Sequence, residues 1–534
     1  MTQAVTIYGA DGRPIPRQSS RDRAMRAALQ HFGPGGFSGA RGDKRSLKTW
    51  WPGSRSADSD SVGDLDALRG RARDLDRNSP IAAGAINTPV TSIVGHGLSV
   101  KATINREILG LDDAAAEAWE RRAELIFDVF ALNCDITRRM LFAQQTELAL
   151  RSELQSGDVL AVRRFKQRPG NLLGTKIQLV EADRISTPPA MAANPRVIDG
   201  VELDDDGAPV RFWVSNRHPK EHRGEVPTWT SVPAYSARTG EPTALFLAHL
   251  QRPGQTRGIP YLARVIEPLK QIERLTEAEL AAAVISAFFT VFVTTENAQG
   301  LANQSTEDSS ESTDGPLAPG HDYEMAPAAI VDLAEGESIE TANPNRPNAQ
   351  FDPFFLAIAK QIGVALEIPF EVLMKCFQAS YSASRASLLE AWRAFRARRA
   401  RLVNQWCQPV YAWVIEEAIA RALLAAPGFF QDPLARHAWL GATWTGPSPG
   451  QIDPTKEAEA AKRLIDLGAS TYTQAAAELT GTDWERNHVR LVKETAMRRA
   501  AGLDKEAVAE GIDTEVSEPE PEPSQDEPEK EDAS

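Results

Sequence analysis

The stretch that decides the fold runs from Phe370 to Arg401 and reads FEVLMKCFQASYSASRASLLEAWRAFRARRAR. A small-residue, hydroxyl-rich segment from Gln378 to Ser384 precedes a long run with helical spacing. Ser387 and Glu390 have the capping-box spacing, in which each side chain satisfies a free backbone N–H of the first turn. The sequence therefore predicts a loop followed by a long helix that begins at Ser387.

The predicted helix has apolar positions three and four residues apart, which is typical of a helix with one buried face. These positions are Leu388, Leu389, Trp392, Phe395, Leu402, Val403 and Trp406. Four arginines fall mainly between them, namely Arg393, Arg396, Arg398 and Arg401. We expect one buried face and one basic face. Taken alone, the segment also fits an ordinary helix–loop–helix turn.

The segment Ser380-Tyr381-Ser382-Ala383-Ser384-Arg385 resembles the channel loop of the lambda-type portal proteins of tailed bacteriophages, with Ala379 where that family commonly has Asn. Further segments resemble the same family in the same order, over roughly residues 50 to 490. They are Leu68 to Pro80, Ile93 to Leu98, Cys134-Asp135, Gly157-Asp158, Ile177 to Ile185, His249, Arg252 to Pro260, and Gln451 to Glu457. Their order makes the resemblance specific, although each segment alone is a weak signal.

The resemblance implies an α+β, mostly helical fold with wing, stem, clip and crown regions, assembled as a ring. The regions expected on this basis are a basic N-terminal arm (1–56), a wing-like domain (57–260), stem helices (261–366) with a clip-like insert (about 290–350), a channel loop (367–386), a long wing helix (387–430), a crown-like region (431–512) and an acidic tail (513–534).

The resemblance also implies a function. A ring of about twelve subunits would occupy one capsid vertex, pass double-stranded DNA, and contact the terminase large subunit, the major capsid and scaffold proteins and the head-completion proteins. It would assemble in the bacterial cytoplasm and remain in the virion. The expected channel-loop residues are Gln378, Ser380, Tyr381, Ser382, Ser384 and Arg385. Arg393 and Arg396 are expected to contact DNA or a neighbouring subunit.

Composition fits a globular chain of more than one domain. Its 534 residues are 42% hydrophobic and 25% charged. Three cysteines, Cys134, Cys376 and Cys407, stand far apart, so neither a disulfide framework nor a thiolate metal site is expected. The apolar run from Leu280 to Val293 is too short to cross a bilayer. We expect no membrane partner.

The net charge of −14 is unevenly distributed. Residues 513–534 hold ten acidic residues, one lysine and several prolines, a composition that buries too little apolar surface to fold. Residues 1–55 hold ten Lys or Arg against three Asp, which is typical of an arm that meets nucleic acid or an acidic partner, or of a solvated terminus.

No catalytic motif is present. The sequence lacks a GxxxxGK[ST] loop and an HExxH motif, and Val100 replaces the third glycine of the pattern that begins Gly95-His96-Gly97. The alternative interpretation is an enzyme. The protein would then be a metal-dependent nuclease whose active site contains Asp135, Asp158, Glu181 and Asp183. Glu181 and Asp183 alternate along a predicted strand and fit a salt bridge at a sheet edge equally well. We expect that the protein is not an enzyme and that it binds neither a cofactor nor a metal ion.

The remaining pattern predicts the main helices and strands. Helices are expected over 64–94 with interruptions at Pro80 and Pro89, over 114–130, over 142–156, from Ile259 with a kink or restart near Pro268, over 351–366 and over 455–480. Strands are expected over 159–162, 177–180, 210–214 and 290–295 and near Ser338, with a turn at 204–206.

Deleting residues 513–534 is expected to leave the melting temperature nearly unchanged, because a segment without a core contributes little to the stability of the folded state. Differential scanning calorimetry of the full-length and shortened chains checks this. A large fall in melting temperature would show that the tail packs against the body.

Overall fold

The computed structural model describes residues 45–221, 226–287, 291–295, 337–341, 350–377, 380–451 and 453–503. The expected acidic tail, most of the basic arm and most of the clip-like insert lie outside these residues. The chain forms two units, one of residues 1–60 with 252–255 and the other of residues 61–251 and 256–534. In the first unit Arg252 pairs with Asp60 at 2.6 Å and donates a hydrogen bond to the Arg55 carbonyl at 2.9 Å.

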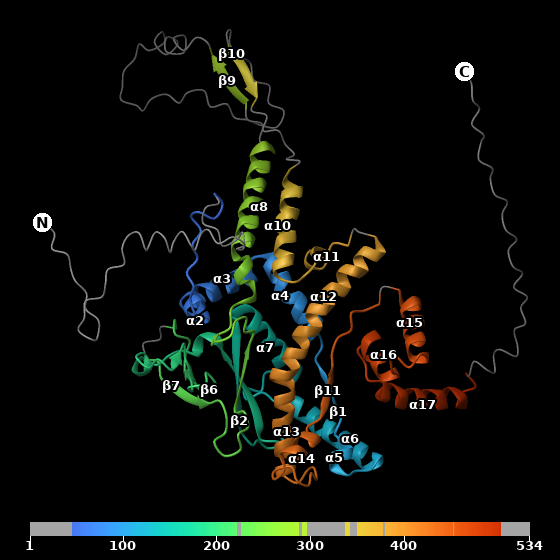
Figure 1. The fold of residues 1–534 in the computed structure, drawn as a ribbon. Helices are drawn as coiled ribbons and strands as arrows, with labels where there is room; N and C mark the ends of the chain where they lie inside the picture. Colours follow the sequence, from blue (N-terminus) through green and yellow to red (C-terminus); the bar gives the residue numbers. More distant parts are fainter. Residues whose placement is uncertain are drawn as a thin grey trace, which may run out of the picture. The chain divides into compact units, whose positions relative to one another are not determined.

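The fold of the second unit is α+β and mostly helical, as expected (Figure 1). It begins with α3 (Leu65–Asn78) and α4 (Pro80–Ile93), which follow α2 (Ala57–Ser61) and the short η2 (Val62–Asp64). The predicted interruption at Pro80 is confirmed, because Ser79 is extended and Pro80 opens the new helix. The predicted interruption at Pro89 is wrong. Pro89 lies buried inside α4, where packing against α7 and α12 outweighs the lost backbone hydrogen bond.

Two long helices and an antiparallel sheet follow. The helices α6 (Asp113–Ala131) and α7 (Phe142–Ser156) confirm the predicted spans, and a short α5 (Arg106–Leu109) precedes them. The sheet has the order β3–β2–β8, with β2 (Asp158–Phe165) between β3 (Thr175–Glu181) and β8 (Ala244–Ala248). A separate pair joins β1 (Ser99–Ala102) to β11 (Ala442–Thr445), so distant parts of the chain share this unit.

A four-stranded antiparallel sheet has its own apolar core. Its order is β4 (Val197–Ile198), β5 (Val201–Leu203), β6 (Pro209–Ser215) and β7 (Trp229–Pro233). The predicted turn at 204–206 is confirmed, since the Asp204 carboxylate accepts hydrogen bonds from the backbone N–H of Asp206 at 3.0 Å and of Ala208 at 2.8 Å. The short turns η3 (Ala182–Arg184) and η4 (Pro189–Met191) connect this sheet to β3.

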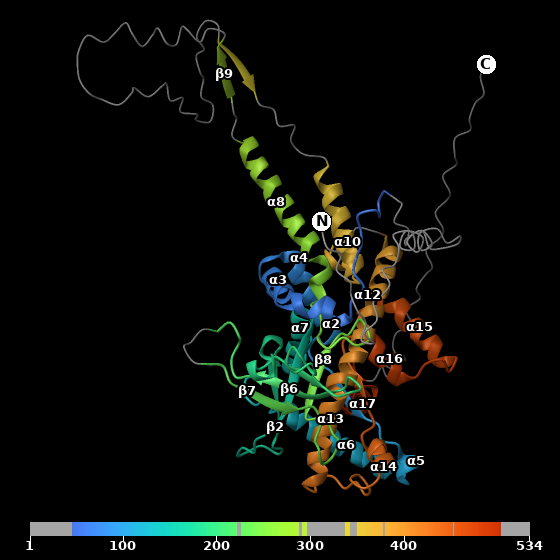
Figure 2. The ribbon, with the colours of Figure 1, turned by 60° about the vertical axis from the view of Figure 1, so that its left-hand side comes forward.

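The two helices expected for the stem are present, and their role as a stem stays a prediction. The first is η5 (Tyr261–Val265) continued by α8 (Ile266–Ala287), and the change from 3₁₀ to α geometry is the restart expected near Pro268. The second is α10 (Phe351–Ala365), which lies beside α8 (Figures 1 and 2). Between them in sequence, β9 (Val291–Thr295) pairs with β10 (Glu337–Thr341) in antiparallel register, which confirms both predicted strands.

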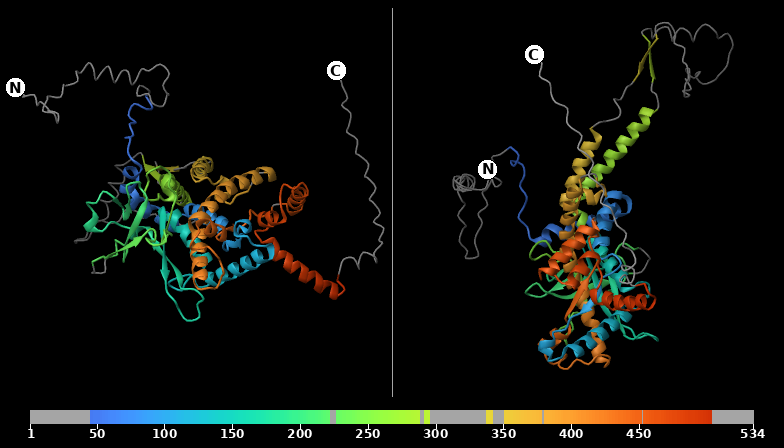
Figure 3. Two further views of the ribbon diagram at one scale, coloured as in Figure 1. Left: turned by 60° about the horizontal axis from the view of Figure 1, so that its bottom comes forward. Right: turned by 90° about the vertical axis from the view of Figure 1, so that its right-hand side faces the viewer.

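A helical run without a break connects Tyr381 to Ala420. It consists of α12 (Tyr381–Leu402), a π-helical turn η6 (Val403–Cys407) and α13 (Gln408–Ala420), and it follows the short α11 (Phe370–Leu373) (Figure 3, orange). Trp406, Tyr411 and Trp413 on this run are fully buried. The Trp406 ring N–H donates a hydrogen bond to the Thr146 hydroxyl at 2.9 Å, which fixes the run against α7.

Shorter helices complete the second unit: α14 (Pro433–Trp439), α15 (Pro454–Asp466), α16 (Tyr472–Leu479) and α17 (Trp484–Ala500). The predicted helical region 455–480 is therefore two helices, with a break between them. Asp453, Thr471 and Asp483 cap the last three helices by accepting a hydrogen bond from a first-turn N–H. Among the described helices, none has the length and hydropathy that a bilayer crossing requires.

A buried carboxylate joins three of these elements. Asp158, at the start of β2, accepts hydrogen bonds from the Arg257 guanidinium on both oxygens, each at 2.8 Å, and from the Gly258 N–H at 2.9 Å. Arg69 of α3 approaches the same carboxylate at 3.3 Å, and Asp199 contacts Arg257 at 2.7 Å. The Asp158 and Arg257 side chains are fully buried, so each charge depends on the other.

Two glycines allow the backbones at this carboxylate to approach. Gly157 has φ +91°, and a Cβ placed there would lie 2.3 Å from the Gly258 carbonyl oxygen. A Cβ on Gly258 would lie 1.9 Å from the Gly157 carbonyl oxygen. The sequence pairs Gly157-Asp158 and Arg257-Gly258 therefore interlock, shortly before η5 and α8 begin.

Replacing Asp158 by Asn should destabilise the chain by about 3–5 kcal/mol, because two guanidinium groups would lose their buried counter-charge. Urea denaturation followed by circular dichroism measures this loss. The matched control is Asp205→Asn, whose partner Arg196 is exposed, and it should cost at most about 1 kcal/mol. Equal losses in the two variants would contradict the role assigned to Asp158.

Candidate functional site

The predicted channel loop lies at the start of α12. Gln378 lies outside the described residues. Ser380 is the residue that precedes the helix, with φ −58° and ψ 156°, and α12 begins at Tyr381, so the predicted start at Ser387 is wrong. The Ser387 hydroxyl instead donates a hydrogen bond to the Glu371 carboxylate at 3.1 Å. The segment contains neither proline nor glycine, so nothing in it prevents the helix from starting earlier.

The side chains of this segment contact one another and α15. The hydroxyl oxygens of Ser380 and Ser382 lie 3.2 Å apart. The Arg385 guanidinium donates a hydrogen bond to the Tyr381 hydroxyl at 3.3 Å and lies 3.4 Å from the Glu457 carboxylate of α15. The hydrogen bond to Tyr381 raises the pKa of Arg385 above its usual value. The segment therefore presents hydroxyls and one cation whose charge Glu457 partly offsets.

Ser384 also belongs to the first turn of α12, because its backbone N–H donates to the Ser380 carbonyl at 2.9 Å. The remaining two expected residues lie further along the helix. Arg393 is exposed and pairs with Glu390 at 3.0 Å, within its own helix. Arg396 is exposed and lines a pocket of about 200 Å³ together with Arg385 and residues of α15 and α16.

The predicted basic face of α12 is in part an internal face. Arg401 pairs with the buried Glu153 at 2.6 Å, and Arg398 is buried. Arg399 donates hydrogen bonds to the carbonyls of Ser92 at 2.7 Å, Ile93 at 3.0 Å and Pro447 at 2.7 Å. Burial, together with the nearby Arg396 charge, lowers the pKa of Arg399 to about 10. Arg399 and Arg401 hold the helix in place through these partners.

Helical spacing offered a signal for this inward orientation. Arg398 lies three residues after Phe395 and four before Leu402, so all three share one face of the helix. Both apolar residues are buried, and Arg398 is buried with them. The sequence did not show that Glu153 and backbone carbonyls would be there to receive the charges.

The carboxylates of the nuclease alternative have separate partners. Asp135 accepts hydrogen bonds from the backbone N–H groups of Thr137 at 3.0 Å and Arg139 at 2.8 Å. Asp158 binds Arg257, as described above. Glu181, Asp183 and His218 lie close enough to hold a metal ion, but Arg73 pairs with both acids.

The interaction with Arg73 dominates the Asp183 carboxylate. Burial alone would raise its pKa, yet the hydrogen bond and charge of Arg73 outweigh burial and lower the pKa below its usual value. Asp183 lies in the 3₁₀ turn η3 rather than on the predicted strand. The predicted salt bridge is confirmed, and this geometry does not gather the four acids into a two-metal site.

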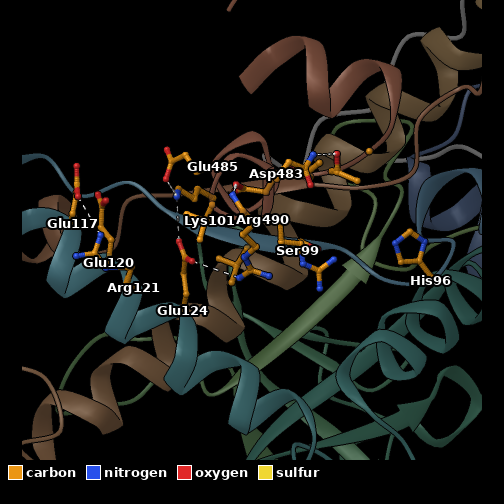
Figure 4. A pocket seen from close by; sticks show the side chains of 17 residues that line it. His96, Ser99, Lys101, Glu117, Glu120, Arg121, Glu124, Asp483, Glu485 and Arg490 are labelled. Carbon is orange, nitrogen blue, oxygen red and sulfur yellow. Dashed lines mark hydrogen bonds and ion pairs between the residues drawn. The ribbon is translucent and has the colours of Figure 1, made fainter. Parts of the chain in front are cut away.

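A pocket of about 690 Å³ lies between β1, α6 and the start of α17 (Figure 4). Glu117, Glu120 and Glu124 extend from α6 toward the pocket, and Lys101 of β1 lies among them. Lys101 pairs with Glu485, and Arg486 lies 3.5 Å from Glu124. Burial raises the pKa of Glu124 even though Lys101 opposes the shift. The ion pairs that line this pocket connect the start of α17 to β1 and α6.

Three phage portal proteins are similar to this chain in sequence. The chain is 28% identical over 531 residues to portal protein B of Escherichia phage lambda and 27% identical over 525 residues to the portal protein of Escherichia phage N15, each covering 94% of this chain and 95% of the relative. A probable portal protein of Halomonas phage phiHAP-1 is 25% identical over 446 residues, covering 82% of this chain and 81% of the relative.

Among solved structures, a chain of the virion of a native gene transfer agent particle has a TM-score of 0.42 at 11% identity, covering 79% of this chain and 96% of that chain. The family of the chain follows from its sequence similarity. The family described as phage portal protein, lambda family, matches residues 43–399, which is more than half of the chain. The chain therefore belongs to the lambda family of phage portal proteins.

Proposed function

We propose that about twelve copies of the chain form a ring at one capsid vertex, through which double-stranded DNA enters and leaves the head. The observation that carries this proposal is the match to portal proteins over nearly the whole length of both chains. The two adjacent stem helices and the long run from Tyr381 to Ala420 support it, since long helices provide a rigid frame for a channel.

The channel contact proposed here comes from the start of α12. Ser380, Tyr381, Ser382, Ser384 and Arg385 would face the DNA, and Gln378 would precede them. Hydroxyls contact phosphate oxygens without adding a charge, whereas each cation contact adds a salt-dependent binding free energy. Because Glu457 partly offsets Arg385, the segment is suited to touch DNA that must slide past it.

The ring would act by holding DNA and its partner proteins in position, and it would not catalyse a reaction. As a virion component it would bind the terminase large subunit during packaging and the head-completion proteins afterwards, and it would contact the major capsid and scaffold proteins during assembly. Arg393 and Arg396 are exposed on α12 and are available to DNA or to a neighbouring subunit. A structural role is supported by the separate partners of the described carboxylates.

Two substitutions at the channel contact should have opposite effects on DNA retention. Arg385→Gln removes one phosphate contact and should lower the retained DNA, by about tenfold at 0.1 M salt for a single binding site. Glu457→Gln frees Arg385 from its carboxylate and should raise retention. The measurement is nuclease-protected DNA in particles assembled with each variant.

The matched control is Arg121→Gln, which removes an exposed arginine that is paired within α6. It should leave both ring formation and DNA retention unchanged. If Arg385→Gln and Glu457→Gln change retention in the same direction, the proposed competition between Glu457 and phosphate is wrong. Loss of the ring itself in these variants would show that the segment is structural.

A further inference from the structure

A cluster of cations lies on two neighbouring loops of the second unit and at the end of β2, next to one of these loops. One loop, residues 132–141, joins α6 to α7, and the other, residues 166–174, joins β2 to β3. We name this cluster the basic patch. Its members are Arg138, Arg139, Arg164, Lys166 and Arg168.

No member of the basic patch forms an ion pair with any residue that the structure describes. The Arg168 guanidinium donates a hydrogen bond to the Ile136 carbonyl at 2.6 Å, which joins the two loops. Neighbouring arginines behave differently, because Arg163 pairs with Glu416 at 3.0 Å and Arg421 pairs with Glu417 at 2.6 Å. The members of the patch therefore differ from these two neighbouring arginines, each of which has a carboxylate partner.

The acid within this region does not neutralise the patch. Asp135 accepts hydrogen bonds from three backbone N–H groups, from the Thr137 hydroxyl and from the Gln145 amide. Burial would raise its pKa, but these hydrogen bonds outweigh burial and hold the pKa below the usual value. Both carboxylate oxygens of Asp135 therefore accept hydrogen bonds from the loop and from the start of α7, and neither pairs with an arginine of the patch.

Two like charges also lie opposite each other on the strands next to the patch. Arg164 of β2 lies opposite Lys176 of β3, so two like charges share one face of the sheet, which is destabilising. The Lys176 side chain is buried, and its ammonium donates to the Leu173 carbonyl at 3.2 Å. Burial lowers the pKa of Lys176, the charges of Arg168 and Arg138 lower it further, and Cys134 and Glu417 oppose the shift. Positive charge is thus concentrated at this end of the sheet.

Three members of the patch line a concave surface. This pocket of about 350 Å³ is lined by Arg138, Arg139 and Arg168 together with Asn133, Asn171 and the Asp135 carboxylate described above. Arg138 has φ +63°, a left-handed conformation that costs energy in a residue other than glycine. Guanidinium and amide groups are the donors that proteins use to contact phosphate oxygens.

We infer that the basic patch binds the phosphodiester backbone of duplex DNA at a surface separate from the channel contact. The choice of DNA as the source of phosphate rests on the proposed function. Several cations spread over two loops, with neutral amide donors between them, suit consecutive phosphates of one backbone.

The patch and the channel contact lie at opposite ends of one helical run. The β2–β3 hairpin contacts the end of α13, where the Glu417 carboxylate accepts hydrogen bonds from the backbone N–H groups of Gly174 and Thr175, each at 2.7 Å. The channel contact is at the start of α12. At 1.5 Å per residue, the run from Tyr381 to Ala420 separates them by about 60 Å. One phosphate group cannot contact both.

The test is binding of a short fluorescent DNA duplex to the assembled full-length chain, measured by anisotropy over a range of salt concentrations. The variant combines three exposed positions: Arg138→Gln, Arg164→Gln and Lys166→Gln. The control combines three exposed arginines elsewhere: Arg71→Gln, Arg122→Gln and Arg274→Gln. Both triple variants remove the same charge, and circular dichroism verifies that both are folded.

The patch variant should bind DNA about a hundredfold more weakly at 0.1 M salt, and the slope of log K against log salt should become shallower by about 2–3. The control should retain wild-type affinity and slope. Equal losses in both variants would overturn the inference, because only net charge would then matter.

Polyglutamate serves as a competing ligand. If the patch binds polyglutamate more tightly than DNA at equal salt, the surface is a docking site for an acidic protein and the inference is overturned. Failure of the proposed function is distinguishable from failure of this inference. A chain that forms no ring contradicts the former, whereas rings that bind DNA equally well with and without the three cations contradict only the latter.

Discussion

The buried pair of Asp158 and Arg257 is the constraint on which the rest of the structure depends. It connects the first strand of the three-stranded sheet to the segment that leads into the stem, and Arg69 adds α3 to the same contact. A buried carboxylate requires counter-charges and hydrogen bonds, so these three elements have one mutual arrangement. Gly157 and Gly258 permit the backbone contact that this arrangement needs.

The helical run from Tyr381 to Ala420 connects the proposed functional surfaces. Its aromatic residues bury one face against α4, α6 and α7, and inward arginines fix the position of the run through Glu153 and through the carbonyls at the end of α4. The proposed channel contact is at one end, and the basic patch adjoins the other. The two proposed DNA contacts would therefore lie at opposite ends of one helical run.

Periodicity predicted most helices and strands because local spacing decides which face is buried, as in α6, α7, α10 and β2. It failed at Pro89 and Ser387, where tertiary packing and neighbouring side chains overrode local signals. Periodicity could not predict the pairing of Asp158 with Arg257, because the two residues are distant in sequence and either side chain could have faced solvent. The basic patch was missed because an arginine without a partner looks the same in sequence as a paired one.

The measurement that tests the central claim most directly is electron microscopy of the chain assembled with its scaffold and capsid proteins, with native mass spectrometry of the same sample. The account predicts a closed ring of about twelve subunits with a central hole wide enough for duplex DNA. Monomers, dimers or open chains of subunits under those conditions would contradict it.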